Sequence, residues 1–158
     1  MPASQHNTVL DIPTGAEVGV SDWIVVDQEM INGFGRVTLD PDPMHVDPEW
    51  AADGPFGGAI AFGFLTVSLL THMLHSAMGT HPGKENAALG HYLNYGFDRL
   101  RLVSPVPAGA RIRGRFVKLR QDEDEKGRFR TTFDCVVEIE GADRPALIAQ
   151  WLSIWVPA

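Results

Sequence analysis

The amino-acid sequence predicts an α+β fold in which one antiparallel β-sheet wraps around a long central helix. Residues 59–78 are mostly apolar over a helix-length stretch, and Gly79 directly after them is a typical helix end. Most of residues 88–156 has the pattern of strands, because polar and apolar residues alternate between turn sequences. A helix that is apolar nearly all round needs cover on several sides, and a curved sheet provides that cover.

Five strands are expected, one ahead of the central helix and four after it. The first is residues 23–26, and the others are residues 88–103, 111–120, 128–140 and 146–156, with a charged turn at 121–127. In the fourth strand one face is expected to carry Phe129, Thr131, Phe133, Cys135, Val137 and Ile139. The strand order along the chain suits a meandering antiparallel sheet.

Two short helices are expected between the first strand and the central helix. One spans residues 28–35 with Asp27 as its N-cap. The other spans residues 48–53 with Pro48 in its first position, where proline is favourable. After the central helix, residues 81–86 are expected to form a polar connection.

Residues 39–47 are expected to form a constrained, non-helical loop that carries an acid and an imidazole. Pro41 and Pro43 disfavour helical backbone in this segment, and Asp40 and His45 lie five positions apart. A carboxylate and an imidazole held together are suited to general acid–base catalysis. The alternative is a solvated turn in which the aspartate only caps a backbone N–H.

A glycine-rich segment leads into the central helix and indicates a second part of a catalytic site. Gly57, Gly58 and Gly63 allow a ligand to approach the backbone closely. The first N–H groups of a helix have no partner within the helix, so they can stabilise a carbonyl oxygen that becomes negative during a reaction. The alternative is structural: Gly57 and Gly58 make a turn, and Gly63 packs a strand against the helix.

The bulk properties indicate one soluble domain spanning residues 1–158. The chain has 13 basic and 20 acidic residues, and the resulting net charge of −7 argues against general nucleic-acid binding. The apolar stretch at 59–78 contains Thr, Ser and His side chains, so we interpret it as a core helix and expect no membrane contact. Cys135 is the single cysteine, which excludes an intramolecular disulfide and indicates a reducing compartment. The first ten residues lack a signal-peptide pattern, so a cytoplasmic protein is expected.

Several motifs in order give the sequence a resemblance to a known family. They are Gly19-Val20-Ser21-Asp22-Trp23, Asp40 with His45-Val46-Asp47-Pro48, Pro55-Phe56-Gly57-Gly58-Ala59-Ile60-Ala61, Gly63-Phe64-Leu65-Thr66, and Asn94-Tyr95-Gly96-Phe97-Asp98 with Ser104-Pro105-Val106. With these motifs the chain resembles the MaoC-like hydratases, in particular the subgroup similar to nodulation protein N. The resemblance covers most of the chain and implies a hot-dog fold and reversible hydration of a 2-enoyl thioester.

The resemblance also implies roles for individual residues. Asp40 and His45 match the family's catalytic aspartate and histidine, and Gly63 matches the residue whose N–H binds the thioester oxygen. No metal or redox cofactor is implied, because coenzyme A or phosphopantetheine enters as part of the substrate. A homodimer is implied, with part of the pocket coming from the partner, and an unpaired sheet edge favours such pairing as well.

Five further residues are expected to bind the substrate. Phe56, Gly58 and Phe62 flank the entry of the central helix. Arg99 and Arg101 belong to a run of seven basic residues without an acid, which suits the phosphates of coenzyme A or an acidic acyl carrier protein. The alternative for this run is a solvated sheet face that neighbouring acids neutralise.

Three positions depart from the family pattern. Leu39 replaces a glycine, Asp42 replaces an asparagine, and Phe62 stands where the family commonly has histidine. Because of these departures, one alternative is a non-catalytic accessory protein that binds acyl thioesters. A hot-dog thioesterase, in which water attacks the carbonyl carbon, is the other enzymatic alternative.

The central helix also carries two histidines. His72 and His75 lie three positions apart, a spacing that can bind a metal ion, but no carboxylate or third histidine accompanies them. We therefore expect polar positions that face a cleft or an interface, and no metal site.

Overall fold

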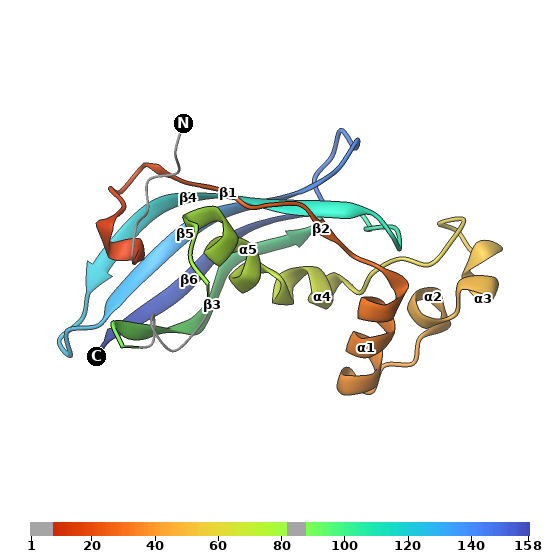
Figure 1. The fold of residues 1–158 in the computed structure, drawn as a ribbon, viewed down its shortest axis with the longest axis horizontal. Helices are drawn as coiled ribbons and strands as arrows, with labels where there is room; N and C mark the ends of the chain where they lie inside the picture. Colours follow the sequence, from red (N-terminus) through yellow and green to blue (C-terminus); the bar gives the residue numbers. More distant parts are fainter. Residues whose placement is uncertain (1–7, 82–87) are drawn as a thin grey trace.

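The computed structural model describes residues 8–81 and 88–158 of the chain (Figure 1). In chain order the elements are the 3-10 helix η1 (Val9–Asp11), β1 (Glu17–Val20), β2 (Ile24–Val25), α1 (Gln28–Thr38), α2 (Pro43–Val46), α3 (Pro48–Ala52), α4 (Gly63–Ser68), α5 (Leu70–Met78), β3 (Gly90–Leu102), β4 (Arg111–Glu123), β5 (Phe129–Ile139) and β6 (Leu147–Pro157). Nearly all of the predicted polar connection at 81–86 lies outside the described residues.

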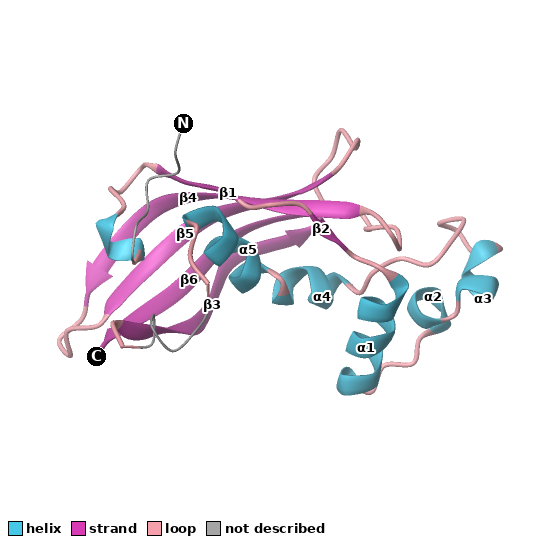
Figure 2. Cartoon of the chain, in the orientation of Figure 1, coloured by secondary structure: helices cyan, strands magenta, loops and turns pink. Residues whose placement is uncertain are grey.

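The strands of the described residues form one antiparallel sheet in the order β1-β4-β5-β6-β3, with β2 also paired to β4. The sheet curves over α5 (Figure 2). Two glycines let α5 lie close to the sheet: a Cβ atom on Gly114 would lie 3.1 Å from Met73 Cβ, and one on Gly19 would lie 2.6 Å from the Ala77 carbonyl oxygen. The predicted α+β class, with a sheet around a central helix, is confirmed.

The predicted alternation of buried and exposed residues is also confirmed. In β5 the odd-numbered residues from Thr131 to Ile139 are buried, whereas Asp134 is exposed. Phe133 packs against Trp151 of β6 with ring centroids 5.8 Å apart. The face of the sheet toward the helix is therefore the apolar core, and the opposite face is largely polar.

The central helix begins four residues later than predicted and is interrupted once. Residues 59–62 are extended rather than helical, because the Ala61 N–H donates to the Val106 carbonyl oxygen at 2.8 Å. The helix then starts at Gly63 and is divided at Leu69 into α4 and α5. No helix in the described part of the chain is both long and apolar enough to cross a membrane.

The prediction of a non-helical segment at 39–47 was partly wrong. Pro43 occupies the first position of the short helix α2, where its missing N–H needs no partner and its fixed φ suits the helix. The preceding helix α1 is three residues longer than predicted and ends at Thr38. Strand β1 was not predicted, because its four residues pair with β4 through a register shift and give no clear alternation.

Candidate active site

Separate segments of the chain converge on Gly35, near the end of α1. A Cβ atom on Gly35 would lie 2.9 Å from the Asp40 carbonyl oxygen, 3.0 Å from Val46 Cγ1 and 3.1 Å from Phe62 Cζ. The loop after α1, helix α2 and the residue before α4 therefore meet here, beyond one end of the sheet (Figure 1). The predicted acid, histidine and helix-entry glycine lie in or directly beside these converging segments.

Asp40 lies in the tight turn that ends α1. Leu39 adopts left-handed backbone with φ 59° and ψ 34°, and the Asp40 N–H then donates to the Gly35 carbonyl oxygen at 3.0 Å. The Asp40 side chain is exposed, and its Oδ1 accepts the N–H of Asp42 at 3.2 Å. Its second carboxylate oxygen has no hydrogen-bond partner within the described residues, so it is available to a water molecule or a substrate.

Asp42, which replaces the family's asparagine, is the N-cap residue of α2. Its side chain accepts the Met44 N–H at 2.9 Å and thereby caps the N-terminus of α2. Aspartate and asparagine are about equally good at this position of a helix. The replacement therefore preserves the loop that presents Asp40 and His45.

His45 is buried, with only 9% of its surface exposed, and one hydrogen bond orients its ring. Its Nδ1 lies 2.7 Å from the carbonyl oxygen of Ile60. A carbonyl oxygen can only accept, so Nδ1 carries the proton and the neutral ring has its unshared pair on Nε2. The His45 backbone is tied to α1 because Gln28 donates to its carbonyl oxygen at 2.7 Å. The arrangement leaves Nε2 as a base or a hydrogen-bond acceptor.

Phe62, the third departure from the family pattern, packs against this histidine. The ring centroids of His45 and Phe62 are 4.0 Å apart. The ring centroid of Phe34, a residue of α1, lies 5.3 Å from that of Phe62. The Phe62 side chain is buried in the core. The geometry gives it a positioning role for the imidazole, while its predicted contact with substrate stays a prediction.

Gly63 is the first residue of α4, and the extended Phe62 precedes it. Its N–H has no acceptor among the described residues, as expected for the first position of a helix. The structural reading of this glycine also holds, because a Cβ atom would lie 2.2 Å from Leu102 Cδ1 of β3. Gly63 thus combines an unpaired N–H with close strand packing.

Comparison with known proteins matches residues 10–138 to the model of the MaoC like domain family. The chain is 46% identical over 150 residues to "Nodulation protein N" of Rhizobium leguminosarum bv. viciae, which covers 93% of this chain and 90% of the relative. The chain belongs to the MaoC-like family. It is also 40% identical over 142 residues to "3-hydroxyacyl-thioester dehydratase Z" of Mycobacterium tuberculosis, covering 90% of each chain.

The structural comparison agrees with the family assignment. The chain superposes on the monoamine oxidase regulatory protein from Archaeoglobus fulgius with a TM-score of 0.76, 22% sequence identity and 94% of each chain covered. The predicted hot-dog fold is confirmed by this likeness.

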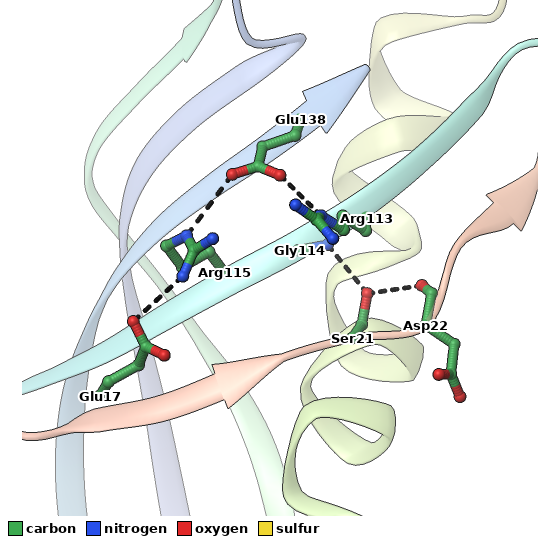
Figure 3. Close-up of polar contacts among 7 residues, drawn as sticks. All are labelled: Glu17, Ser21, Asp22, Arg113, Gly114, Arg115 and Glu138. Carbon is green, nitrogen blue, oxygen red and sulfur yellow. Dashed lines mark hydrogen bonds and ion pairs between the residues drawn. The ribbon is translucent and has the colours of Figure 1, made fainter. Parts of the chain in front are cut away.

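The arginines on β4 of this MaoC-like chain form ion pairs with carboxylates. The pairs are Arg111 with Glu140, Arg113 with Glu138, Arg115 with Glu138 and Glu17, and Arg120 with Asp122. Figure 3 shows Arg113 and Arg115 pointing toward Glu138. The Arg113 hydrogen bond holds the pKa of Glu138 below its usual range. On β4 the neutralised sheet face, rather than a phosphate-binding patch, is therefore what is observed.

Arg99 and Arg101 on β3 differ from the arginines of β4. Both are exposed, and neither has a carboxylate partner among the described residues. Arg101 donates to the Leu100 carbonyl oxygen at 2.7 Å. Of the predicted phosphate-binding run, these two side chains keep their capacity to bind an anion.

The remaining predicted site residues lie in the turn ahead of α4. Gly57 has a φ of 68°, which supports its reading as a turn residue. Gly58 has open space where a Cβ would stand, and the side chain of Phe56 is half-exposed. Within the described residues, no three His, Cys, Asp or Glu side chains are grouped so as to hold a metal ion.

Two contributors to the site were missed at the level of sequence. The Ile60 carbonyl that orients His45 is a backbone group, so no residue type could indicate it. Gly35 looks like an ordinary helix glycine, and its role depends on three segments meeting from different parts of the chain.

Proposed function

We propose that this MaoC-like protein is a hydratase/dehydratase that reversibly adds water to a 2-enoyl thioester and yields a 3-hydroxyacyl thioester. The observation that carries the proposal is the fixed orientation of His45. Its Nδ1–H is held by the Ile60 carbonyl, Nε2 has no hydrogen-bond partner among the described residues, and the ring packs against Phe62, the residue directly before α4. The naming of a 40% identical relative as a 3-hydroxyacyl-thioester dehydratase supports the same conclusion.

In the proposed reaction, Asp40 and His45 Nε2 hold one water molecule between them. The carboxylate takes a proton from this water as its oxygen bonds to C3 of the enoyl group. Electron density moves to the thioester oxygen, which the Gly63 N–H stabilises as an enolate. The pair then returns a proton to C2, so that one water has been added and no other reactant is consumed.

The substrate is proposed to carry its own prosthetic arm, either coenzyme A or the phosphopantetheine of an acyl carrier protein. Arg99 and Arg101 are proposed to contact its phosphates, because both are exposed and neither has a carboxylate partner among the described residues. Phe56 and Gly58 are proposed to line the entry. No metal or redox cofactor takes part in this scheme.

We also propose that the protein works as a homodimer joined through β3 in the cytoplasm. β3 is a long strand at one edge of the sheet. It exposes Leu93, Tyr95, Phe97 and Leu102, an unusual amount of apolar surface for an edge strand. A second copy pairing with this edge would cover both the apolar side chains and the unpaired backbone.

The experiment that tests the proposed function mixes the protein with a short trans-2-enoyl-coenzyme A. Loss of the enoyl-thioester absorbance is followed beside a thiol reagent that detects free coenzyme A. We expect absorbance loss without thiol release. Thiol release would instead indicate the hot-dog thioesterase, and binding without either change would indicate the non-catalytic accessory protein.

A further inference from the structure

Helix α2, which carries His45, is too short to hold its position by itself. It spans only Pro43–Val46, and isolated helices of fewer than about 12 residues are marginal in water. The last carbonyl groups of any helix also lack a hydrogen-bond partner within that helix. Contacts from other segments of the chain therefore decide where the His45 imidazole lies.

Two carbonyl oxygens of α2 accept hydrogen bonds from two different segments. The Ile60 N–H donates to the Met44 carbonyl oxygen at 3.3 Å. The side-chain amide of Gln28, the first residue of α1, donates to the His45 carbonyl oxygen at 2.7 Å. Helix α2 is thus held between the extended segment ahead of α4 and the start of α1.

The two supports of α2 differ in chemical kind. The Ile60 support is a backbone contact, and the next residue, Ala61, is itself fixed by its N–H bond to the Val106 carbonyl oxygen at 2.8 Å. Among the described residues, Gln28 is the one side chain outside α2 and its N-cap that bonds to the α2 backbone. The position of His45 is therefore under the control of a single side chain of α1.

The Gln28 amide has its own orientation fixed by a neighbour. Its Nε2 also donates to Asn32 Oδ1 at 2.9 Å, one turn further along α1. An amide nitrogen carries two protons, and each of the two acceptors takes one. The reversed amide would place Gln28 Oε1 against the His45 carbonyl oxygen, where neither atom can donate. Asn32 therefore helps to keep the donor directed at His45.

The bond from Gln28 bears on the reaction through the tautomer of His45. The Ile60 carbonyl oxygen, 2.7 Å from Nδ1, favours the ring with its proton on Nδ1 and its unshared pair on Nε2. A displacement of the His45 backbone relative to Ile60 would weaken this preference. The ring would then also populate the Nε2–H form, which cannot accept a hydrogen bond at Nε2.

We infer that Gln28, oriented by Asn32, is a positioning residue that holds the His45 imidazole in the place and the tautomer that the reaction requires. The inference rests on the proposed function, because that function gives Nε2 a part in holding the reacting water. Gln28 acts through His45 and needs no contact with the substrate. Misplacing a reacting group by about 1 Å can lower a rate up to about 10²-fold, so loss of this support should cost about tenfold.

Gln28→Met tests the inference with two measurements. Methionine has a similar length but no N–H, so the His45 carbonyl oxygen loses its partner. In the hydration assay, kcat should fall about tenfold while KM changes by less than about threefold, because binding of the thioester does not involve this bond. In long-range proton–nitrogen NMR of the free protein, neutral His45 should be in the Nδ1–H form in the wild type and partly in the Nε2–H form in the variant.

Three further variants of α1 serve as controls. Glu29→Met introduces the same side chain at the neighbouring exposed position and should leave both kcat and the tautomer unchanged. Asn32→Leu frees the Gln28 amide and should change both readouts in the same direction as Gln28→Met, but by less. Asn32→Asp retains the accepting oxygen and should restore the behaviour of the wild type.

The outcomes separate this inference from the proposed function. A normal kcat in Gln28→Met would overturn the positioning role, and so would a lowered kcat with an unchanged tautomer, since that result indicates a general loss of structure. If Gln28→Met does not fold, Asn32→Leu decides by the same two readouts. A wild type that hydrates no enoyl thioester overturns the proposed function. The tautomer of His45, measured without substrate, then still supports or overturns the control by Gln28.

Discussion

Two regions of this molecule carry conspicuous polar residues, and they use them differently. On the outer face of the sheet, Arg113 and Arg115 both bind Glu138, and Arg113 also lies over the Trp23 ring at 4.4 Å. In the loop after α1, Asp40 and His45 have few polar partners, and each keeps one atom without a partner in the described structure.

Charge density alone therefore does not mark the proposed reactive site. A guanidinium that is bound to a carboxylate has little remaining capacity for a ligand, and an exposed pair of this kind contributes only modestly to stability. A partly satisfied group on a fixed backbone keeps an atom for chemistry. The following predictions test whether the paired charges on the sheet stabilise the fold while the loop with Asp40 and His45 carries the reaction.

The largest effect is expected from Gly63→Pro. Proline suits the first helical position, and the extended Phe62 before it, with φ −58° and ψ 134°, is compatible with a following proline. The substitution removes the N–H that is proposed to stabilise the enolate, so kcat for enoyl-thioester hydration should fall about 10²- to 10³-fold.

Gly63→Ala is the matched control for that variant. It places a similar Cβ atom against Leu102 but retains the N–H. Rates that fall equally in the alanine and proline variants would assign the whole effect to packing against Leu102 and remove the N–H from the mechanism.

His45→Ala should lower turnover by about 10²-fold, the usual contribution of a positioned acid or base. Because the substitution also removes the packing on Phe62 and the bond to the Ile60 carbonyl, the melting temperature should fall as well, so the rates are compared at a temperature at which both proteins remain folded. The comparison variant is His72→Ala, which removes an exposed histidine on α5. Comparable losses in both would contradict the special position of His45.

Glu138→Gln tests the other region and should affect stability rather than turnover. The pKa of Glu138 is lowered mainly by its hydrogen bond with Arg113, so the stabilisation is present above the ordinary pKa of about 4.5 and is lost as the pH falls through the lowered folded-state value. Denaturant unfolding should give a loss of about 0.5–1 kcal/mol at pH 7 that becomes smaller as the pH falls below the ordinary pKa. A hydration rate reduced tenfold or more would refute the purely structural role of this face.

An effect of similar size but opposite sign is expected from Leu39→Gly. Leu39 has left-handed backbone and its side chain is 87% exposed, so it gains little packing in return for the strain. Glycine removes that strain but adds freedom to the unfolded chain, and the net gain in the free energy of unfolding should be about 0.5–1 kcal/mol. Thermal unfolding checks this, and a destabilised variant would indicate that Leu39 is covered in solution.

The sequence predicted the elements whose signals are local. The Asp27 cap of α1 is confirmed by its bond from the Met30 N–H at 2.8 Å, and the predicted inner face of β5 is confirmed from Thr131 to Ile139. The start of the central helix was missed because the Ala61 hydrogen bond to Val106 joins distant segments. No local pattern contains that information.

Lys118 is an intermediate case. Grouping it with the neighbouring arginines by charge predicted an exposed patch. Its position in β4 has the same parity as the buried Ile112 and Phe116, so the strand pattern already placed it on the inner face. The packing of Phe62 on His45, in contrast, required the converging segments to be seen in space.

The most direct test of the account is the rate of enoyl-thioester hydration in Asp40→Asn beside the wild type. Asparagine keeps the oxygen that accepts the Asp42 N–H, so the turn should be retained while the base is lost. The expected result is a fall of about 10²-fold or more with an unchanged melting temperature. A near-normal rate in this variant would contradict the assignment of the chemistry to the Asp40 and His45 loop.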